Sequence, residues 1–230
     1  MQPHPVTDRP SSRSPLRYPG GKSRAVAQLL PFFPEQPGEL CSPFIGGGSL
    51  ELALAARGWR VHGYDALGPL VDFWQCLLTT PQALADEVER YHPLSRERFY
   101  RLQEERFESQ LERAAVFYVL NRASFSGSTM SGGMSPGHPR FTKSSIERLR
   151  SFTAPTVTVE QADFRDSIPK HPTATIYADP PYPDAKSLYG RRGDLHDGFD
   201  HDGLRELLRS RDNWVLSCSD CPQVRRMYEG

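Results

Sequence analysis

The amino-acid sequence predicts an α/β fold whose parallel sheet is interrupted by a long helical segment. Strand-like and helix-like stretches alternate in the first and last parts of the chain, as in sheets built from strand–helix–strand units. From residue 67 to about residue 120 the pattern is almost entirely helical. The chain has 230 residues, 37% of them hydrophobic, which is enough for one large domain or for a domain with an insertion.

The first strand–helix–strand unit follows a segment that lacks apolar periodicity. Residues 1–14 are rich in Pro, Ser and Arg and predict a disordered N-terminus. ELCSPF (39–44) predicts a strand that ends in a glycine-rich turn, and SLELALAARG (49–58) predicts a helix. WRVHGYD (59–65) predicts a second strand, which ends in an acid.

The helical segment and the remaining strands complete the predicted organisation. Helices are predicted over VDFWQCLL, PQALADEVERY, SRERFYRLQEERF, LERAAVFYVL and SSIERLRSF. RASFSGSTMSGGMSPGHPRF, before the last of these, is dense in Gly, Ser and Pro and predicts an irregular loop. Strands are predicted within TVTVEQAD (156–163), TATIYAD (173–179) and NWVLSCSD (213–220). We therefore assign residues 15–66 and 154–230 to a sheet domain and residues 67–153 to an insertion.

The charge balance and the cysteines exclude several classes of function. The formal net charge is zero, so binding to nucleic acid would depend on local basic patches, of which residues 9–24 and 138–150 are the candidates. No apolar run has the length of a membrane span and the N-terminus lacks a signal-peptide core, so we expect a cytoplasmic protein without membrane contacts. The four cysteines lack zinc-site spacing, and we expect no metal.

The string PLRYPGGKS (15–23) ends like a nucleotide-binding P-loop but lacks the rest of that motif. A P-loop needs an earlier glycine where this chain has Leu16, and a buried strand where it has SSRSP. ATP or GTP binding at this segment is therefore not predicted.

Two motifs predict a site that binds a nucleoside-containing cofactor and a flat amine. Gly46, Gly47 and Gly48 lie where a strand turns into a helix, and Asp65 ends the next strand, where a carboxylate can accept the hydrogens of ribose hydroxyls. ADPPYP (178–183) follows another strand, and its prolines remove backbone donors. The carboxylate of Asp179, the carbonyl of Pro180 and the ring of Tyr182 then suit an amino group on a flat ring.

These motifs and their order resemble those of the Dam-type, class alpha, DNA adenine methyltransferases. RYPGGK is similar to the family's (W/Y)xGGK segment, PFIGGGS to its cofactor loop and YD to its ribose acid. NRASFSG (121–127) is similar to its NRxxxNG element, and DPPY is similar to its catalytic motif. The resemblance covers roughly residues 15–220. It implies a Rossmann-like methyltransferase sheet, with residues 67–153 as a target-recognition insertion.

The resemblance also implies a cofactor and a reaction. The cofactor is S-adenosylmethionine, and the residues assigned to it are Tyr18, Gly21, Lys22, Phe44, Gly46, Gly48, Asp65, Asp163, Phe164 and Asp179. The reaction is methyl transfer to N6 of an adenine flipped out of double-stranded DNA. Tyr182 would stack on the base, while Asp179 and Pro180 would accept its amino hydrogens. No covalent intermediate and no metal are needed.

The partner that the resemblance implies is duplex DNA. The residues assigned to DNA are Arg17, Asn121, Arg122, Phe125, Arg140 and Lys143. Phe125 would fill the space of the flipped base, Arg17 would contact a base, and Arg140 and Lys143 would contact phosphates. Ser126–Met130 departs from the family's Asn-Gly-Leu-x-Arg pattern, so GATC specificity does not carry over and no recognition sequence is predicted.

Other functions remain open at this point. A cytosine-N4 methyltransferase would use similar geometry, although Asp179 in the first motif position favours adenine. A protein or RNA methyltransferase and a catalytically impaired, truncated DNA-binding remnant are further alternatives. The chain stops at Gly230, whereas relatives continue through two more strands, so we expect those strands to be missing and residues 213–218 to form an open sheet edge. We expect this edge to make the isolated protein poorly soluble or to let it self-associate. Oligomeric state and biological role (phage protection, restriction–modification or housekeeping) are not predicted.

Overall fold

A parallel five-stranded sheet forms the centre of the molecule, as the computed structural model shows for residues 10–18, 20–125, 132–135, 140–182 and 199–228. The strands are β1 (Glu39–Ser42), β2 (Arg60–Asp65), β3 (Val157–Gln161), β4 (Thr175–Ala178) and β5 (Trp214–Leu216). Their order in the sheet is β3-β2-β1-β4-β5, so the winding reverses between β1 and β4. Open α/β sheets bind ligands at the carboxyl ends of the strands beside such a reversal. The predicted Rossmann-like fold is confirmed.

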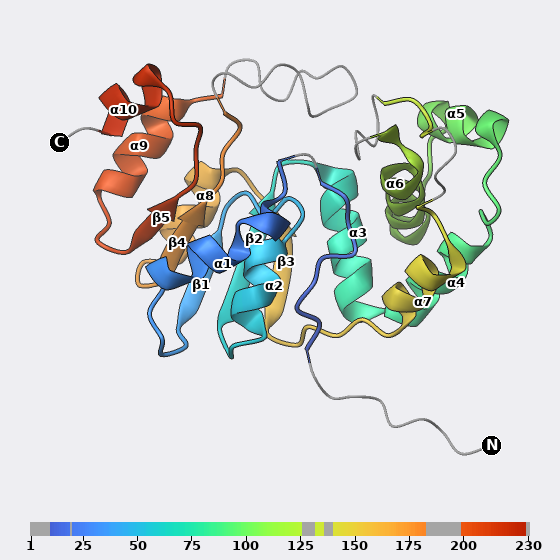
Figure 1. Ribbon diagram of the computed structural model, residues 1–230, viewed down its shortest axis with the longest axis horizontal. Helices are drawn as coiled ribbons and strands as arrows, with labels where there is room; N and C mark the ends of the chain where they lie inside the picture. The colour runs from blue at the N-terminus through green and yellow to red at the C-terminus, as the bar shows by residue number, and fades with distance from the viewer. Residues whose placement is uncertain (1–9, 19, 126–131, 136–139, 183–198, 229–230) are drawn as a thin grey trace.

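Helices cover both faces of the sheet (Figure 1). The helices on one face are α1 (Val26–Leu29), flanked by short 3-10 turns at Lys22–Arg24 and Leu30–Phe32, α2 (Ser49–Ala55) and α3 (Gly68–Thr79); those on the other are α8 (Phe164–Lys170) and α9 (His201–Arg209). Alternation along β4 explains the two layers, because successive side chains of a strand point to opposite faces. Tyr177 packs into the first layer, whereas Ile176 and Ala178 pack against α8 and α9.

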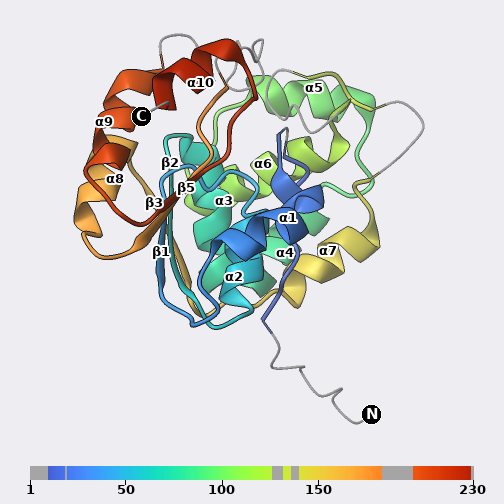
Figure 2. The same cartoon turned by 60° about the vertical axis from the view of Figure 1, so that its left-hand side comes forward.

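Four more helices form the side of the molecule opposite α9 and the last helix, α10 (Pro222–Tyr228) (Figures 1 and 2). They are α4 (Pro81–Glu89), α5 (Arg96–Glu104), α6 (Gln110–Ala123) and α7 (Lys143–Arg150). Capping boxes fix the first residues of two of them, since Ser109 caps α6 and Thr142 caps α7. The predicted helical insertion is thus present as α3 to α7.

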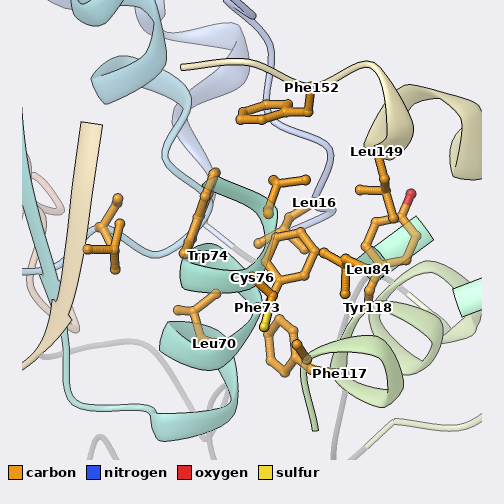
Figure 3. Close-up of a cluster of buried hydrophobic side chains, with 14 of the residues drawn as sticks. Leu16, Leu70, Phe73, Trp74, Cys76, Leu84, Phe117, Tyr118, Leu149 and Phe152 are labelled. Atoms are coloured by element: carbon orange, nitrogen blue, oxygen red, sulfur yellow. The ribbon is translucent and has the colours of Figure 1, made fainter. Parts of the chain in front are cut away.

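One hydrophobic core joins this insertion to the sheet (Figure 3). Phe73 and Trp74 of α3 lie between the two parts, and the ring of Phe73 stacks on Tyr118 of α6 with centroids 5.5 Å apart. On the sheet side, the amide of Gln75 donates a hydrogen bond to the carbonyl of Val159 in β3 (3.0 Å). Because α3 packs against both parts, the described helices of the insertion share one core with the sheet, and the predicted boundary at residue 67 stays a prediction.

Two segments differ from their predicted form. Residues 1–9 lie outside the described part of the chain, but Ser11, expected in a disordered lead-in, exchanges two hydrogen bonds with Thr153 (2.7 and 3.2 Å). β5 is the edge strand of the described sheet, as predicted, yet it spans only three residues, and Trp214 packs against Tyr228 of α10 (6.3 Å between centroids). None of the described helices is long and apolar enough to cross a membrane.

Candidate functional site

A cavity of about 270 Å³ opens at the carboxyl ends of the strands, where the winding of the sheet reverses. Segments that are far apart in the sequence meet there, because parallel strands bring all their carboxyl ends to one edge. The predicted cofactor and catalytic residues that line it are Tyr18, Gly21, Lys22, Phe44, Gly46, Gly48, Asp65, Asp163, Phe164, Asp179, Pro180 and Tyr182. The structure therefore brings all of these residues together.

The glycine turn after β1 is required by aromatic packing as well as by backbone geometry. Gly46 and Gly48 have φ angles of 45° and 63°, which other residues rarely adopt. A Cβ atom on Gly46 would lie 2.9 Å from the ring of Tyr18, and one on Gly48 would lie 2.8 Å from Trp74. The indole of Trp74 also donates to the Gly46 carbonyl (2.9 Å). The turn is thus packed between two rings, and Tyr18 becomes part of the cavity wall.

Asp65 ends β2 and faces the glycine turn. Its carboxylate accepts hydrogen bonds from the backbone N–H groups of Gly46 (3.1 Å) and Leu67 (3.0 Å). Burial raises the pKa of Asp65 to about 6, and these two donors limit the rise. The remaining lone pairs of this carboxylate suit the two hydroxyls of a ribose.

An aromatic wall lies on the side of the cavity next to α8. The ring of Phe164 is 5.9 Å from that of Phe44 and 5.3 Å from that of Phe199, a residue not predicted from the sequence. Asp163 caps α8 through the N–H of Arg165 (2.9 Å) and pairs with its guanidinium (3.0 Å). This wall suits the face of a flat heterocycle.

Asp179, at the end of β4, accepts hydrogen bonds from three side chains. Lys22 Nζ lies 2.6 Å from each carboxylate oxygen, the hydroxyl of Ser217 lies 2.7 Å from Oδ1, and the hydroxyl of Tyr182 lies 3.3 Å from Oδ1. Lys22 Nζ also lies 5.1 Å from the centroid of the Tyr182 ring. Burial by itself would lower the pKa of Lys22, but the ion pair with Asp179 outweighs it and the pKa is raised. Asp179 is thus held as an acceptor.

Glu51 is a second buried acid in this cavity, and the sequence analysis missed it. It is only 3% exposed, and Ser42 donates a hydrogen bond to its Oε1 (2.7 Å). Burial raises its pKa to about 7, while the Ser42 hydroxyl opposes the rise. An acid in the first turn of an otherwise apolar helix, immediately after a glycine turn, is the pattern that could have revealed it.

Two residues predicted to bind DNA make internal hydrogen bonds in this structure. Asn121 is completely buried, and its amide exchanges hydrogen bonds with the backbone N–H (2.9 Å) and carbonyl (2.8 Å) of Arg17. Arg122 is half-buried, and its guanidinium donates to the carbonyl of Arg140 (2.8 and 3.0 Å) and to that of Pro15 (3.4 Å). Sequence alone could not separate these internal contacts from surface contacts, because burial depends on residues about a hundred positions away.

Three of the other predicted DNA-binding residues lie on the surface of the described chain, and the fourth, Arg17, is half-buried. Phe125, directly after α6, is 63% exposed, and Arg140 and Lys143 are exposed as well. Burial and the nearby charges of Arg140 and Arg122 lower the pKa of Arg17. These like charges repel one another, so the cluster favours a polyanion as its partner. Residues 126–131 and 136–139 of the predicted DNA loop lie outside the described residues.

The described residues include no group of three or more His, Cys, Asp or Glu side chains that could hold a metal ion.

Comparison with known proteins gives one family match. A family model described as D12 class N6 adenine-specific DNA methyltransferase matches residues 18–230, a range that contains every cavity-lining residue named above. No curated protein matches the chain.

Proposed function

The chain belongs to the D12 class of N6 adenine-specific DNA methyltransferases, and from this membership we propose a site-specific enzyme that methylates a flipped adenine in duplex DNA with S-adenosylmethionine as the donor. The observation that carries the proposal is the meeting of Asp65, Asp179 and Tyr182 in one cavity. Flipping is part of the proposal because N6 of a paired adenine is engaged in the duplex.

The residues present fit the proposed cofactor. The carboxylates of Glu51, Asp65 and Asp179 line the cavity together with one ammonium group, that of Lys22, so its charge balance suits a cation. Asp65 would accept the ribose hydroxyls, and Phe44 and Phe164 would pack against the adenine of the cofactor. When bound, S-adenosylmethionine supplies a methyl group on a positively charged sulfur, which suits direct displacement.

The target adenine would lie against Asp179, Pro180 and Tyr182. Tyr182 would stack on the ring, and the Asp179 carboxylate and the Pro180 carbonyl would accept the two amino hydrogens. Lys22 now contacts both oxygens of Asp179, so the amino group would share an oxygen with Lys22 or displace it. Positioning of the amine accounts for most of the catalysis in such a site.

Duplex DNA would lie across the surface that carries Phe125 and the basic cluster. We propose that Phe125 fills the space left by the flipped base and that Arg140 and Lys143 contact phosphates. Arg17 would reach the DNA at the mouth of the cavity, while Asn121 and Arg122 hold its segment in place. We place the enzyme in the cytoplasm of a bacterial or phage-infected cell, where such a substrate lies.

Two experiments test this function. Expression in a host without DNA methylation, followed by long-read sequencing, should reveal methylated adenines within one short sequence. Labelled methyl groups should be transferred to duplexes that contain adenine. They should not be transferred to RNA or to control duplexes that contain cytosine but no adenine. Transfer to cytosine would favour the cytosine-N4 alternative, and transfer to neither would favour an impaired DNA-binding remnant.

A further inference from the structure

The two oxygens of Asp179 have different partners, although both contact Lys22. Oδ1 accepts hydrogen bonds from the hydroxyls of Ser217 and Tyr182, whereas Lys22 is the one side chain with a hydrogen bond to Oδ2 in the described part of the chain. Displacement of Lys22 alone would therefore free Oδ2, while Oδ1 would stay anchored.

The register of the sheet places Ser217 beside Asp179. β5 runs parallel to β4 with Leu216 opposite Ala178, so the residues that follow the two strands are neighbours. The backbone N–H of Ser217 donates to the carbonyl of Ala178 (2.9 Å), which continues the ladder by one step. Ser217 is half-buried, so its orientation is set by the sheet.

Tyr177 supports Ser217 from beneath the site. It precedes Asp179 by two residues in β4, so both side chains point to the same face of the sheet. The Tyr177 hydroxyl lies 3.0 Å from Ser217 Oγ, and its ring is buried in the core. Ser217 has a single hydroxyl hydrogen, which it donates to a carboxylate that can only accept, so Tyr177 must be the donor in their contact.

We propose that Ser217, held by Tyr177, is a positioning residue that fixes the Asp179 carboxylate so that Oδ2 is the oxygen offered to the target amino group. The inference rests on the proposed function of Asp179. Ser217 touches neither the base nor the methyl donor in this scheme and acts through Asp179 alone. It directly follows β5, in a segment that none of the recognised motifs includes.

The test measures single-turnover transfer of labelled methyl groups from S-adenosylmethionine to genomic DNA of a methylation-deficient host. Ser217→Ala should lower the rate constant by about tenfold to a hundredfold, because a misoriented acceptor misplaces the amine. Affinity for S-adenosylhomocysteine, measured by calorimetry, and the melting temperature should stay close to those of the wild type. Ser217→Thr, which keeps the hydroxyl, should restore most of the rate, and Ser219→Ala is the matched control.

Non-additivity separates positioning from a general structural effect. Tyr177→Phe removes one buried oxygen and should lower the rate less than Ser217→Ala, and the double variant should be no slower than Ser217→Ala alone. In an Asp179→Asn background, Ser217→Ala should have no further effect. Three results would each overturn the proposal. The first is a Ser217→Ala rate within about twofold of the wild type, and the second is independent effects of the two variants. The third is a loss of rate in Ser217→Ala that is matched by a loss of affinity for S-adenosylhomocysteine and a lower melting temperature.

A separate readout distinguishes this inference from the function on which it rests. If the wild type transfers no methyl group to adenine, the proposed function fails. Crystal structures of the wild type and of Ser217→Ala then still decide the positioning role. A rotated Asp179 carboxylate in the variant would support it, and an unchanged orientation would overturn it. Tyr177→Phe serves in the same comparison if Ser217→Ala does not fold.

Discussion

Asp179 connects three segments of the chain, since its donors come from the N-terminal Gly-Gly-Lys segment, from its own turn and from the end of β5. These donors stabilise the carboxylate of Asp179 in a cavity that is predicted to hold S-adenosylmethionine and a neutral base. Both of its oxygens accept hydrogen bonds, and Lys22 balances its charge. The carboxylate is thus held in place by contacts from all three segments.

Replacement of this carboxylate separates chemistry from cofactor binding. We expect Asp179→Ala to abolish methyl transfer while the dissociation constant for S-adenosylhomocysteine changes by no more than roughly severalfold, since Asp65 is the proposed ribose contact. Calorimetry and labelled-methyl transfer measure the two effects. Asp65→Asn is the control and should weaken cofactor binding first. Loss of cofactor binding together with activity in Asp179→Ala would mean that the proposed site is misassigned.

Glu51 makes the stability of the protein depend on pH. Its pKa is raised from 4.5 in an unfolded chain to about 7 in the folded one, so the folded state binds more protons in this range. The free energy of unfolding should therefore fall as pH rises from about 4.5 through about 7. Lys22 and Asp179, the nearest charged groups, act on this pKa in opposite directions.

The variant Glu51→Gln cannot ionise and keeps an oxygen for the Ser42 hydroxyl. At about pH 8 we expect it to be more stable than the wild type, by up to roughly 3 kcal/mol, and at about pH 4 the two should be similar. Urea denaturation at both pH values is the measurement. Asp65, whose pKa is also raised, leaves part of the pH dependence in the variant. A variant that is destabilised at high pH would contradict the assignment of a costly buried charge.

At the scale of elements, the end of α6 connects Phe125, which we propose contacts DNA, to the N-terminal segment. Asn121 in its last turn holds the backbone of Arg17, and Phe125 begins the loop that follows. Removal of the Asn121 amide would leave the N–H and the carbonyl of Arg17 without this partner. The same helix thus orders a segment 104 positions away in the sequence and presents the exposed aromatic ring.

Truncation of Asn121 should loosen this connection. We expect Asn121→Ala to lower the free energy of unfolding by roughly 1–3 kcal/mol, because the N–H and carbonyl of Arg17 lose their partner away from water. Affinity for duplex DNA should also fall, since Arg17 is no longer fixed. Urea denaturation and fluorescence anisotropy measure the two effects, with the exposed Lys143→Ala as a comparison that weakens DNA binding alone. An unchanged free energy of unfolding would argue against a stabilising role for the hydrogen bonds between Asn121 and Arg17.

Phe125 offers a test of the loop itself. We expect Phe125→Ala to reduce base flipping more than it reduces overall DNA affinity, because phosphate contacts dominate binding. A duplex with 2-aminopurine at the target position should lose its fluorescence rise with the variant. Phe32 is likewise exposed, at 69%, and Phe32→Ala is the matched control outside the proposed DNA surface. A full fluorescence rise with Phe125→Ala would show that another group fills the space.

At the scale of the whole molecule, the continuous core makes the insertion and the sheet a single folding unit. Phe73 is fully buried between Trp74 and the aromatic residues of α6, so its ring belongs to the contact surface of both parts. Figure 3 shows these rings filling the space between α3 and α6. A single core predicts that the cofactor cavity and the DNA surface unfold together.

Calorimetry can test this coupling. Phe73→Ala should lower the free energy of unfolding by roughly 3–5 kcal/mol, because it leaves a cavity where the two parts meet. The wild type and the variant should each melt in one transition, and S-adenosylhomocysteine should raise the melting temperature of the entire chain. Two separate transitions, of which the cofactor shifts one, would show that residues 67–153 fold as an independent domain.

The sequence by itself determined the local features of this protein. Apolar alternation and glycine turns predicted the five strands, although β5 is shorter than its apolar stretch, and the ordered motifs identified the residues that meet at the cavity. These predictions succeed because each depends on neighbouring residues along the chain. The helices α8, α9 and α10 were not predicted from the sequence.

The tertiary structure decided which polar residues are buried and which of them meet. Glu51 is buried in the cavity wall only because α2 packs against the sheet. Asn121 binds the backbone of Arg17 only because the N-terminal segment packs against α6. Ser217 reaches Asp179 because β5 pairs with β4 in one particular register, and a shift by a single residue would turn its side chain to the other face. The partners of these polar residues and the register of β5 are set by packing between distant segments, which local sequence patterns alone do not determine.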